Sequence, residues 1–248
     1  MPQRESCIRM VAVDGRICLE IGMTCTVERE RVLRQIAEKI LAIPVSRPLR
    51  VGVDGGSASG KTVFADQLGQ VLEGMGRDVI RAGLDGFHNP SEIRYRKGNM
   101  SMEGYVLDSF DYPAVWQCIL NPLGPGGDRQ YQMEVFDHHS EEGREPEVKT
   151  APEGAILIFE GVMLFREELV EGFDYRIKVD TSPEVKLERA KKRDLAKFGS
   201  LEQLLEKYTK RFLPGQQWYR DQYRPKEIAD VVVGNDDPGS PQVQWNAG

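Results

Sequence analysis

The sequence contains no apolar run of about 18 residues, the length at which a helix becomes a candidate for spanning a membrane. Charges also interrupt the N-terminal segment where a signal peptide would need an apolar core, so we expect a cytoplasmic protein with no membrane partner. The four cysteines, at positions 7, 18, 25 and 118, show no C-x-x-C spacing. Neither a disulfide framework nor a zinc site is therefore predicted.

The chain also lacks an excess of basic residues. It has 33 lysines and arginines against 39 aspartates and glutamates, which gives a net charge of −6. Proteins that bind nucleic acids or anionic membranes usually show a basic footprint, so we expect no nucleic-acid partner. A length of 248 residues with 40% hydrophobic residues suits one domain with appendages and a self-sufficient core, and leaves a homo-oligomer open.

Hydrophobic periodicity divides the chain into a main domain and three shorter segments. We expect an appendage at 1–25, a packing helix at 26–44, the main domain at 45–234 and a C-terminal, loose tail at 235–248. The appendage shows no sustained helical or strand period, and Met23 is an alternative start of the chain. The packing helix is expected to follow Thr26, a suitable N-cap, and to end before Pro44.

Short apolar segments alternate with amphipathic segments through the main domain. Strands are expected at 49–54, 79–84, 155–159, 175–179 and 229–233. Helices are expected at 62–72, after the N-cap Ser182, and behind the capping box of Ser200 and Gln203. Strands that alternate with helices predict an α/β fold with a mainly parallel sheet.

Two long segments between these elements are rich in glycine, proline and polar residues. They span 85–110 and 121–153, and a hairpin is expected around 131–136. Loops of this length inside a compact domain are more often site-forming than simple connections. We therefore expect both segments to contribute to a functional site.

The strongest motif is a match to G-x-x-x-x-G-K-[S/T], formed by Gly55, Gly56, Ser57, Ala58, Ser59, Gly60, Lys61 and Thr62. It lies between an expected strand and an expected helix, the context that a phosphate-binding loop requires. The backbone N–H groups of the loop and the helix N-terminus would bind phosphate oxygens. Lys61 would reach the β- and γ-phosphates of a nucleotide, and the Thr62 hydroxyl would bind Mg²⁺.

A phosphate-binding loop alone is compatible with GTPases, ATPase motors and small-molecule kinases. No N-K-x-D guanine-reading motif occurs in the sequence, and no D-x-x-G follows an apolar strand, which disfavours a GTPase. Motors usually need a longer chain. The residues that follow the other strands favour a small-molecule kinase.

Two carboxylates follow apolar strands, at the edge where open α/β sheets build their sites. Asp85 lies just past the second strand and would orient or accept the proton of an acceptor hydroxyl. From position alone, bracing of a loop turn explains Asp85 equally well. Glu160 lies at the end of the strand at 155–159, close to where Mg²⁺ would bind.

The helix behind Ser182 carries a cationic face, because Arg189, Arg193 and Lys197 follow one another at intervals of four residues. Such a face can neutralise a transferring phosphoryl group, although a solvated surface is the more common explanation. The three histidines lack metal-ligand spacing, which argues against a zinc site.

Taken together, the motifs resemble the uridine kinase family of P-loop kinases, which is related to phosphoribulokinase and to bacterial pantothenate kinase. The resemblance covers about residues 51–233 and rests on the order and spacing of 54–62 (DGGSASGKT), 84–88 (LDGFH), 109–113 (SFDYP), 159–164 (FEGVML), 179–181 (VDT), 189–194 (RAKKRD) and 229–233 (ADVVV). It implies a nucleoside-monophosphate-kinase-like P-loop NTPase fold, a three-layer sandwich with a helical lid. It also implies transfer of the γ-phosphoryl group of ATP to a primary hydroxyl.

On the phosphate side, the resemblance implies a role for each motif residue. The segment 55–62 would bind ATP, with Lys61 on the phosphates, and Asp85 would be the catalytic carboxylate near the hydroxyl. Arg189 and Arg193 would belong to the lid that covers the phosphates. Mg²⁺ would be held by Thr62 together with Glu160.

On the acceptor side, the resemblance implies that Asp111 accepts hydrogen bonds from ribose hydroxyls and that Phe110 packs near a base. His88 and Tyr131 would belong to the same acceptor pocket, which the expected hairpin would line. The sequence departs from the family at 85–88, where uridine kinases usually carry Asp-Ser-Phe-Tyr and this chain has Asp-Gly-Phe-His, closer to pantothenate-kinase-like branches. Lys197 stands where arginines are common.

We therefore expect a cytoplasmic kinase that depends on ATP and Mg²⁺ and acts on a small-molecule acceptor. A pyrimidine nucleoside is the first choice of acceptor, and pantothenate or another non-nucleoside alcohol is the alternative. A non-catalytic nucleotide-binding regulator is the alternative from another class.

Overall fold

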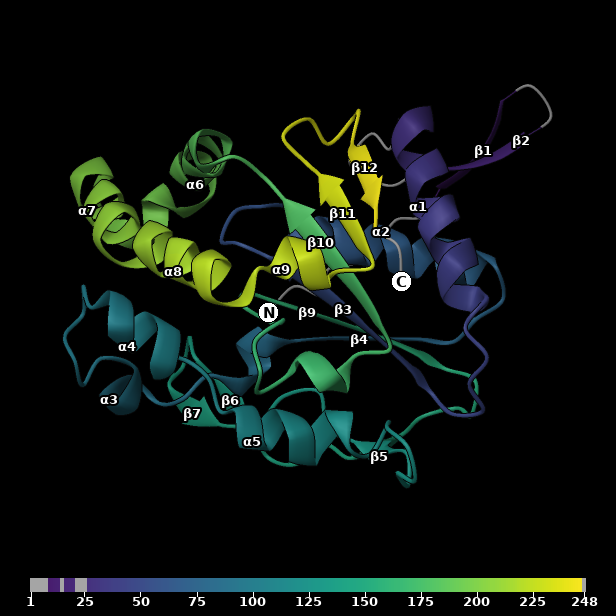
Figure 1. The fold of residues 1–248 in the computed structure, drawn as a ribbon, viewed down its shortest axis with the longest axis horizontal. Helices are drawn as coiled ribbons and strands as arrows, with labels where there is room; N and C mark the ends of the chain where they lie inside the picture. The colour runs from purple at the N-terminus through teal and green to yellow at the C-terminus, as the bar shows by residue number, and fades with distance from the viewer. Residues whose placement is uncertain (1–8, 14–15, 21–25, 247–248) are drawn as a thin grey trace.

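The structure is a computed structural model that describes residues 9–13, 16–20 and 26–246. Within these residues, the main sheet has six strands in the spatial order β12 (Gln242–Trp245), β11 (Val231–Gly234), β10 (Tyr175–Asp180), β3 (Leu49–Gly55), β9 (Ile156–Gly161) and β4 (Val79–Gly83) (Figure 1). All neighbours are parallel except β12, which is antiparallel to β11. The prediction of a mainly parallel sheet is confirmed.

Helices cover both faces of this sheet. One face packs against α1 (Val27–Leu41) and α2 (Lys61–Gly74). The other face packs against α4 (Met102–Leu107), α5 (Tyr112–Val115), the π-helical turn η2 (Trp116–Leu120) and α8 (Leu213–Tyr223). The remaining helical segments are η1 (Leu84–Phe87), α3 (Ser91–Arg94), η3 (Val170–Gly172), α6 (Pro183–Phe198), α7 (Leu201–Lys207), η4 (Tyr208–Phe212) and α9 (Pro225–Ile228).

The strand β9 shows why this sheet lies between two helical layers. Ile156 and Ile158 pack in the core beneath α1 and α2, whereas Leu157 and Phe159 pack in the core on the opposite face. Successive side chains of a strand point to opposite faces, so a continuously apolar strand must be covered on both. The three-layer arrangement that the family resemblance implies is therefore observed.

Helix starts follow the capping signals in the sequence. The side chains of Thr26, Ser182 and Ser200 accept hydrogen bonds from the third backbone N–H of α1, α6 and α7, respectively. These contacts confirm the predicted N-caps. No helix within 26–246 combines the length and apolar character needed to cross a bilayer.

Two expectations for local structure are wrong. The tail is not loose throughout, because β12 pairs with β11 and extends the sheet. No hairpin forms around 131–136: β5 (Gln130–Tyr131) pairs with β8 (Lys149–Thr150), and β6 (Phe136–Asp137) pairs with β7 (Glu142–Gly143). The backbone N–H groups of Gln132 and Val135 instead donate to Cys118 and Gly86, so distant segments take the bonds that a hairpin would have used.

The N-terminal segment contains one antiparallel strand pair, β1 (Arg9–Val13) with β2 (Arg16–Glu20), which the absence of a sequence period did not predict. Met23 lies outside the described residues.

Candidate active site

The phosphate-binding loop joins β3 to α2. Three side chains from outside the loop donate hydrogen bonds to one of its backbone carbonyls. The Ser59 oxygen accepts hydrogen bonds from Thr181 Oγ1 at 3.1 Å, Arg189 Nη1 at 3.1 Å and Asn235 Nδ2 at 2.8 Å. Gly60 has a φ of +86°, and a Cβ atom there would lie 2.6 Å from Asn235 Nδ2. Glycine at this position therefore satisfies both a left-handed backbone and a close neighbour.

Lys61 and Thr62 both contact Glu160, although the acid is almost a hundred residues away in the chain. The Thr62 hydroxyl donates to Glu160 Oε1 at 3.0 Å. Lys61 Nζ lies 3.7 Å from Glu160 Oε2. β9 lies beside β3 in the sheet, so Glu160 at the end of one strand reaches the turn that follows the other.

The chemistry of this donor set fits Mg²⁺. A carboxylate and a hydroxyl converge at the loop, and Mg²⁺ is typically bound by one or two carboxylates together with substrate phosphates and water. Within the described residues, no cluster of three or more histidine, cysteine or acidic side chains could hold a metal without such additional ligands. Thr62 and Glu160 are thus suited to a metal that arrives with a nucleotide.

Asp85 shares one cleft of about 530 Å³ with the phosphate-binding loop. It lies in η1, directly after β4, and its side chain is exposed. Ser57, Lys61 and Thr62 line the same cleft. The structure thus brings the predicted catalytic carboxylate and the predicted phosphate ligands to a common space.

The acceptor end of the cleft is formed by segments on either side of Asp85. His88 and Phe110 form an antiparallel bridge, and their rings lie 4.5 Å apart between centroids. The His138 ring lies on the same cluster, with its centroid 4.4 Å from that of His88, and the rings of both pairs are tilted against each other. Burial lowers the pKa of His88 to about 4, so its imidazole is neutral at neutral pH.

A glycine permits this arrangement. A Cβ atom at Gly86 would lie 2.7 Å from Glu134 Cβ, and the Gly86 carbonyl accepts a hydrogen bond from the Val135 N–H at 2.9 Å. The segment leading to His138 therefore approaches η1 more closely than a residue with a side chain would allow. This contact explains how the second long segment reaches the site.

The helix α7 and the π-helical turn η4 contact the segment that precedes Phe110. Lys207 Nζ donates to the Asn99 carbonyl at 2.7 Å, and Arg211 Nη1 donates to the Ser101 carbonyl at 2.8 Å. Arg94 forms an ion pair with Glu141. The first two contacts connect η4 and the end of α7 to the segment that precedes Phe110. The ion pair connects α3 to the turn before β7.

The three cations predicted on one face of α6 have different surroundings. Arg189 donates to the backbone carbonyls of Ser59, Asn235 and Asp236, and does not line the cleft. Arg193 and Lys197 do line it. The structure therefore places Arg189 where it anchors the loop, and Arg193 where it faces the cleft.

Two predicted acceptor residues lie outside the lining of the cleft. Asp111 is the N-cap of α5, and its Oδ1 accepts a hydrogen bond from the Ala114 N–H at 2.9 Å. Tyr131 is buried in β5 and packs in the core with α5 and η2. Phe110 and His88, in contrast, both line the cleft.

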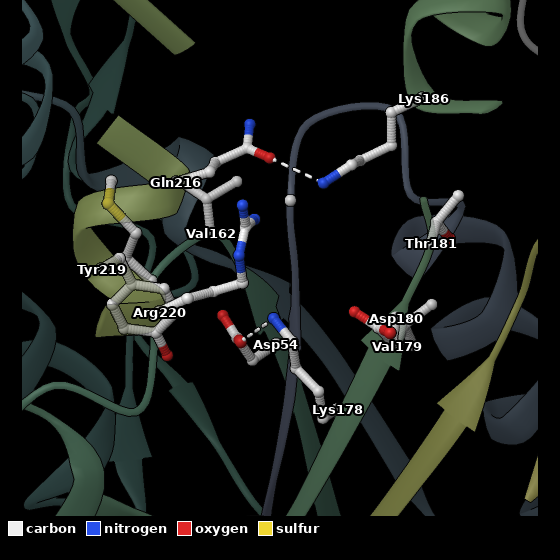
Figure 2. A pocket seen from close by; sticks show the side chains of 12 residues that line it. Asp54, Val162, Lys178, Val179, Asp180, Thr181, Lys186, Gln216, Tyr219 and Arg220 are labelled. Atoms are coloured by element: carbon white, nitrogen blue, oxygen red, sulfur yellow. Dashed lines mark hydrogen bonds and ion pairs between the residues drawn. The ribbon is translucent and has the colours of Figure 1, made fainter. Parts of the chain in front are cut away.

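Polar side chains also support the phosphate-binding loop from behind, where Figure 2 shows two bonded pairs. The buried Asp54 forms an ion pair with Lys178 at 2.6 Å. Lys186 of α6 donates to Gln216 Oε1 of α8 at 3.2 Å. Burial lowers the pKa of Lys186 to about 8, with further lowering by Arg220 and Lys178. The first pair connects β3 to β10, and the second pair connects α6 to α8.

Several residues of the site were not predicted from the sequence. Asn235 fell in the expected tail, and its side chain both donates to Ser59 and accepts from Arg29. Arg94 ends the short helix α3 and Glu141 lies in a turn, and neither belongs to a recognisable motif. Of these residues, only Asn235 could have been identified from the sequence. It directly follows the last parallel strand and therefore lies at the same sheet edge as the loop.

Comparison with known proteins identifies the family of the chain. The model of the Phosphoribulokinase / Uridine kinase family matches residues 50–233. The chain belongs to this family. The kinase is 33% identical to uridine-cytidine kinase B of Dictyostelium discoideum over 189 residues, which are 75% of this chain and 74% of the relative. It is 30% identical to the uridine kinase of Borrelia duttonii (strain Ly), over 74% of this chain and 84% of that one.

Solved structures support the fold of the kinase. A structure described as a possible uridine kinase from Bacillus stearothermophilus matches with a TM-score of 0.64 and 24% identity, and covers 82% of this chain and 97% of that one. A D-glycerate 3-kinase from Cryptococcus neoformans matches with a TM-score of 0.52 and 15% identity, over 86% and 99% of the two chains. The P-loop kinase fold predicted from the motifs is confirmed, and an enzyme is favoured over a non-catalytic regulator.

Proposed function

We propose that this kinase transfers the γ-phosphoryl group of ATP to the primary 5′-hydroxyl of a pyrimidine nucleoside, uridine or cytidine. The observation that carries the proposal is the single cleft that contains Lys61, Thr62, Asp85 and Phe110. It combines a phosphate site, a carboxylate and an aromatic surface. Relatives at 30% and 33% identity are named as uridine and uridine-cytidine kinases.

In the proposed reaction, the acceptor oxygen forms a bond to the γ-phosphorus, and the bond from that phosphorus to the bridging oxygen breaks. ADP leaves, and Asp85 receives or directs the proton that the hydroxyl loses. Lys61 binds the β- and γ-phosphates, and Arg193 faces the transferring group. Mg²⁺, held by Thr62 and Glu160 together with the nucleotide, would neutralise charge on the phosphate oxygens.

The acceptor is proposed to lie against the ring cluster of His88, Phe110 and His138. A pyrimidine has a π-face that stacks on aromatic side chains, and the neutral imidazoles supply hydrogen-bonding nitrogens. Asp111 lies next to Phe110 but outside the lining of the cleft, and its Oδ2 is proposed to accept hydrogen bonds from the ribose hydroxyls, since its Oδ1 caps α5. Tyr131 would support this wall from the core, and Arg189 would hold the loop that binds ATP.

The test is ADP release by the full chain in the presence of Mg²⁺, ATP and one acceptor at a time. The panel contains uridine, cytidine, their 2′-deoxy analogues, pantothenate, D-glycerate and simple sugars. We expect turnover with uridine or cytidine and a lower kcat/KM for the deoxy analogues, because a missing hydroxyl leaves a desolvated acceptor group unpaired. Turnover with pantothenate or D-glycerate and none with the nucleosides would overturn the proposed acceptor.

A further inference from the structure

Four side chains at the phosphate end of the cleft form a closed ring of hydrogen bonds. Arg193 Nε donates to Asp194 Oδ1 at 2.7 Å, and Arg193 Nη2 donates to Asp194 Oδ2 at 2.8 Å. Tyr208 Oη donates to Asp194 Oδ2 at 2.9 Å and lies 3.1 Å from Ser57 Oγ. Arg193 Nη2 also reaches Ser57 Oγ at 3.4 Å. The ring thus connects α6 and η4 to the phosphate-binding loop.

The direction of each hydrogen bond in the ring follows from the chemistry of its members. Burial opposes ionisation of Asp194, but hydrogen bonds from Arg193 and Tyr208 outweigh it and hold the pKa of Asp194 below its ordinary value. The carboxylate is therefore an acceptor only, and the single Tyr208 proton points to it. Ser57 must then donate to Tyr208, which leaves the Ser57 lone pairs free to accept from Arg193.

Tyr208 is the rigid member of the ring. Its side chain is 1% exposed and packs in a small core with Ala58 of the phosphate-binding loop, Ala190 of α6 and Leu204 of α7. Its ring meets that of Phe212 edge to face at 5.2 Å between centroids. A tyrosine confined in this way has one position for its hydroxyl, so it can define the position of the groups bonded to it.

Arg193 is the exposed member of the ring. Its side chain is 56% exposed, whereas that of Asp194 is 6% exposed. The ring uses Nε and Nη2, and no hydrogen-bond partner for Nη1 occurs among the described residues. Because the guanidinium is planar, fixing one edge also fixes the direction of the remaining donors.

We propose that Tyr208 is a positioning residue, which holds the Arg193 guanidinium through Asp194 and Ser57 so that it meets the γ-phosphate of the bound nucleotide. The proposal rests on the proposed phosphoryl transfer, but it assigns to Tyr208 no contact with the substrate. Its role is to align a long, exposed arginine that would otherwise sample many rotamers.

The first test replaces Tyr208 by phenylalanine in the full chain, which keeps the packed ring and removes only the hydroxyl. We expect the ratio of ATP to ADP affinity, measured by isothermal titration calorimetry with Mg²⁺, to fall about tenfold through weaker ATP binding. ADP affinity should stay within twofold of the wild type. With a nucleoside acceptor, kcat should fall by a similar factor while the KM of the acceptor stays constant.

The matched control is Tyr112→Phe. Tyr112 is also buried, and its hydroxyl accepts a hydrogen bond from Arg166 Nη1 at 2.7 Å. Both variants should lose thermal stability, and Tyr208→Phe should lose more, since it removes two hydrogen bonds of a buried hydroxyl and the control removes one. Only Tyr208→Phe should change the ATP to ADP ratio; an equal change in both variants would show a general structural effect and overturn the proposal.

A double-mutant cycle decides whether Tyr208 acts through Arg193. In an Arg193→Ala background, the further change Tyr208→Phe should leave the ATP to ADP ratio unaltered, because the group that Tyr208 positions is gone. A tenfold effect of Tyr208→Phe that persists in this background would overturn the proposal. If Tyr208→Phe does not fold, Asp194→Asn provides the same cycle, with the same expected and contrary results.

The nucleotide-affinity ratio needs no acceptor, so this test is independent of which molecule is phosphorylated. If uridine and cytidine are not substrates but the ratio still depends on Tyr208 through Arg193, only the proposed acceptor fails. If nucleosides are phosphorylated and the ratio does not change, only the positioning role fails.

Discussion

The two ends of the cleft are built in different ways. At the phosphate end, side chains from β9, α2 and α6 meet around one loop and bond directly to one another, as Lys61 and Thr62 do with Glu160. At the acceptor end, the walls come from long irregular segments, which are joined by contacts between tilted rings, such as those of His88 and Phe110, and by hydrogen bonds such as that of the Val135 N–H to Gly86.

The difference suggests a division of labour. Strand ends and helix starts are rigid, so they suit a reaction centre whose atoms must be held within a fraction of an ångström. Loops tolerate sequence change without loss of the fold, so they suit the part of the site that selects the acceptor. We therefore expect variants at the phosphate end to affect kcat and nucleotide binding, and variants at the acceptor end to affect acceptor KM.

The largest effect is expected for Asp85→Asn, at the boundary between the two ends. This change removes the carboxylate that receives the hydroxyl proton and should lower kcat by about 10²–10⁴-fold, with ATP affinity nearly unchanged. The measurements are steady-state kinetics and calorimetry. The control is Asp78→Asn, since Asp78 is exposed at the opposite end of β4. Equal turnover in Asp85→Asn and wild type would show that Asp85 only stabilises its turn and takes no part in the reaction.

A smaller effect is expected for Gly60→Ala, which places a methyl group 2.6 Å from Asn235 Nδ2. ATP affinity should fall by more than about tenfold, because the loop must move away from its anchor. Gly76→Ala is a matched control, since Gly76 has a similar φ of +80° but no atom within 4 Å of the added carbon. Both variants should lose stability from backbone strain, but only Gly60→Ala should lose ATP binding.

A third variant, Glu160→Gln, tests the metal site. The Mg²⁺ concentration needed for half-maximal activity should rise at least about tenfold, because a neutral amide binds the cation more weakly than a carboxylate does. Acceptor KM at saturating Mg²⁺ should remain constant. Glu153→Gln, in an exposed loop, should leave both quantities unchanged. If Glu160→Gln needs the same Mg²⁺ concentration as the wild type, Glu160 does not bind the metal.

The smallest effect is expected at the acceptor end and concerns pH. Burial lowers the pKa of His88 to about 4, below the ordinary value of 6.5. The unfolded chain therefore binds the proton more readily, so the stability contributed by neutral His88 is complete above pH 6.5 and is lost as the pH falls towards 4. Between pH 6.5 and 4.5, the melting temperature of His88→Gln should fall by about 2–4 °C less than that of the wild type. Parallel curves would contradict the burial of this imidazole.

Much of the phosphate end could be predicted from the sequence. The strand, loop and helix around Lys61 follow from a dense local motif, and Glu160 follows from an apolar strand that ends in an acid. Local periodicity determines which residues form strands and helices, and parallel strands present their carboxyl ends at one edge. Asp85 and Glu160 could therefore be assigned to the same region before the coordinates were known.

The acceptor end could be predicted only in outline. Phe110 and His88 line the cleft, but the contact of Gly86 with Val135 and the pairing of 136–143 replace the expected hairpin. These segments have no sustained period and few consecutive apolar residues. Their conformation depends on which distant carbonyl groups they meet, and no local pattern specifies that choice.

The amino-acid order alone predicts a phosphate-binding loop at one sheet edge, because this prediction depends on a motif of eight consecutive residues and on the alternation of strands and helices. The residues that surround the loop, in contrast, follow from the packing of the whole fold. Tyr208 lies 151 residues from Ser57 in the chain, and Asn235 lies 176 residues from Ser59. Contacts of such sequence separation depend on how the whole core packs, so they are fixed only when every layer is in place.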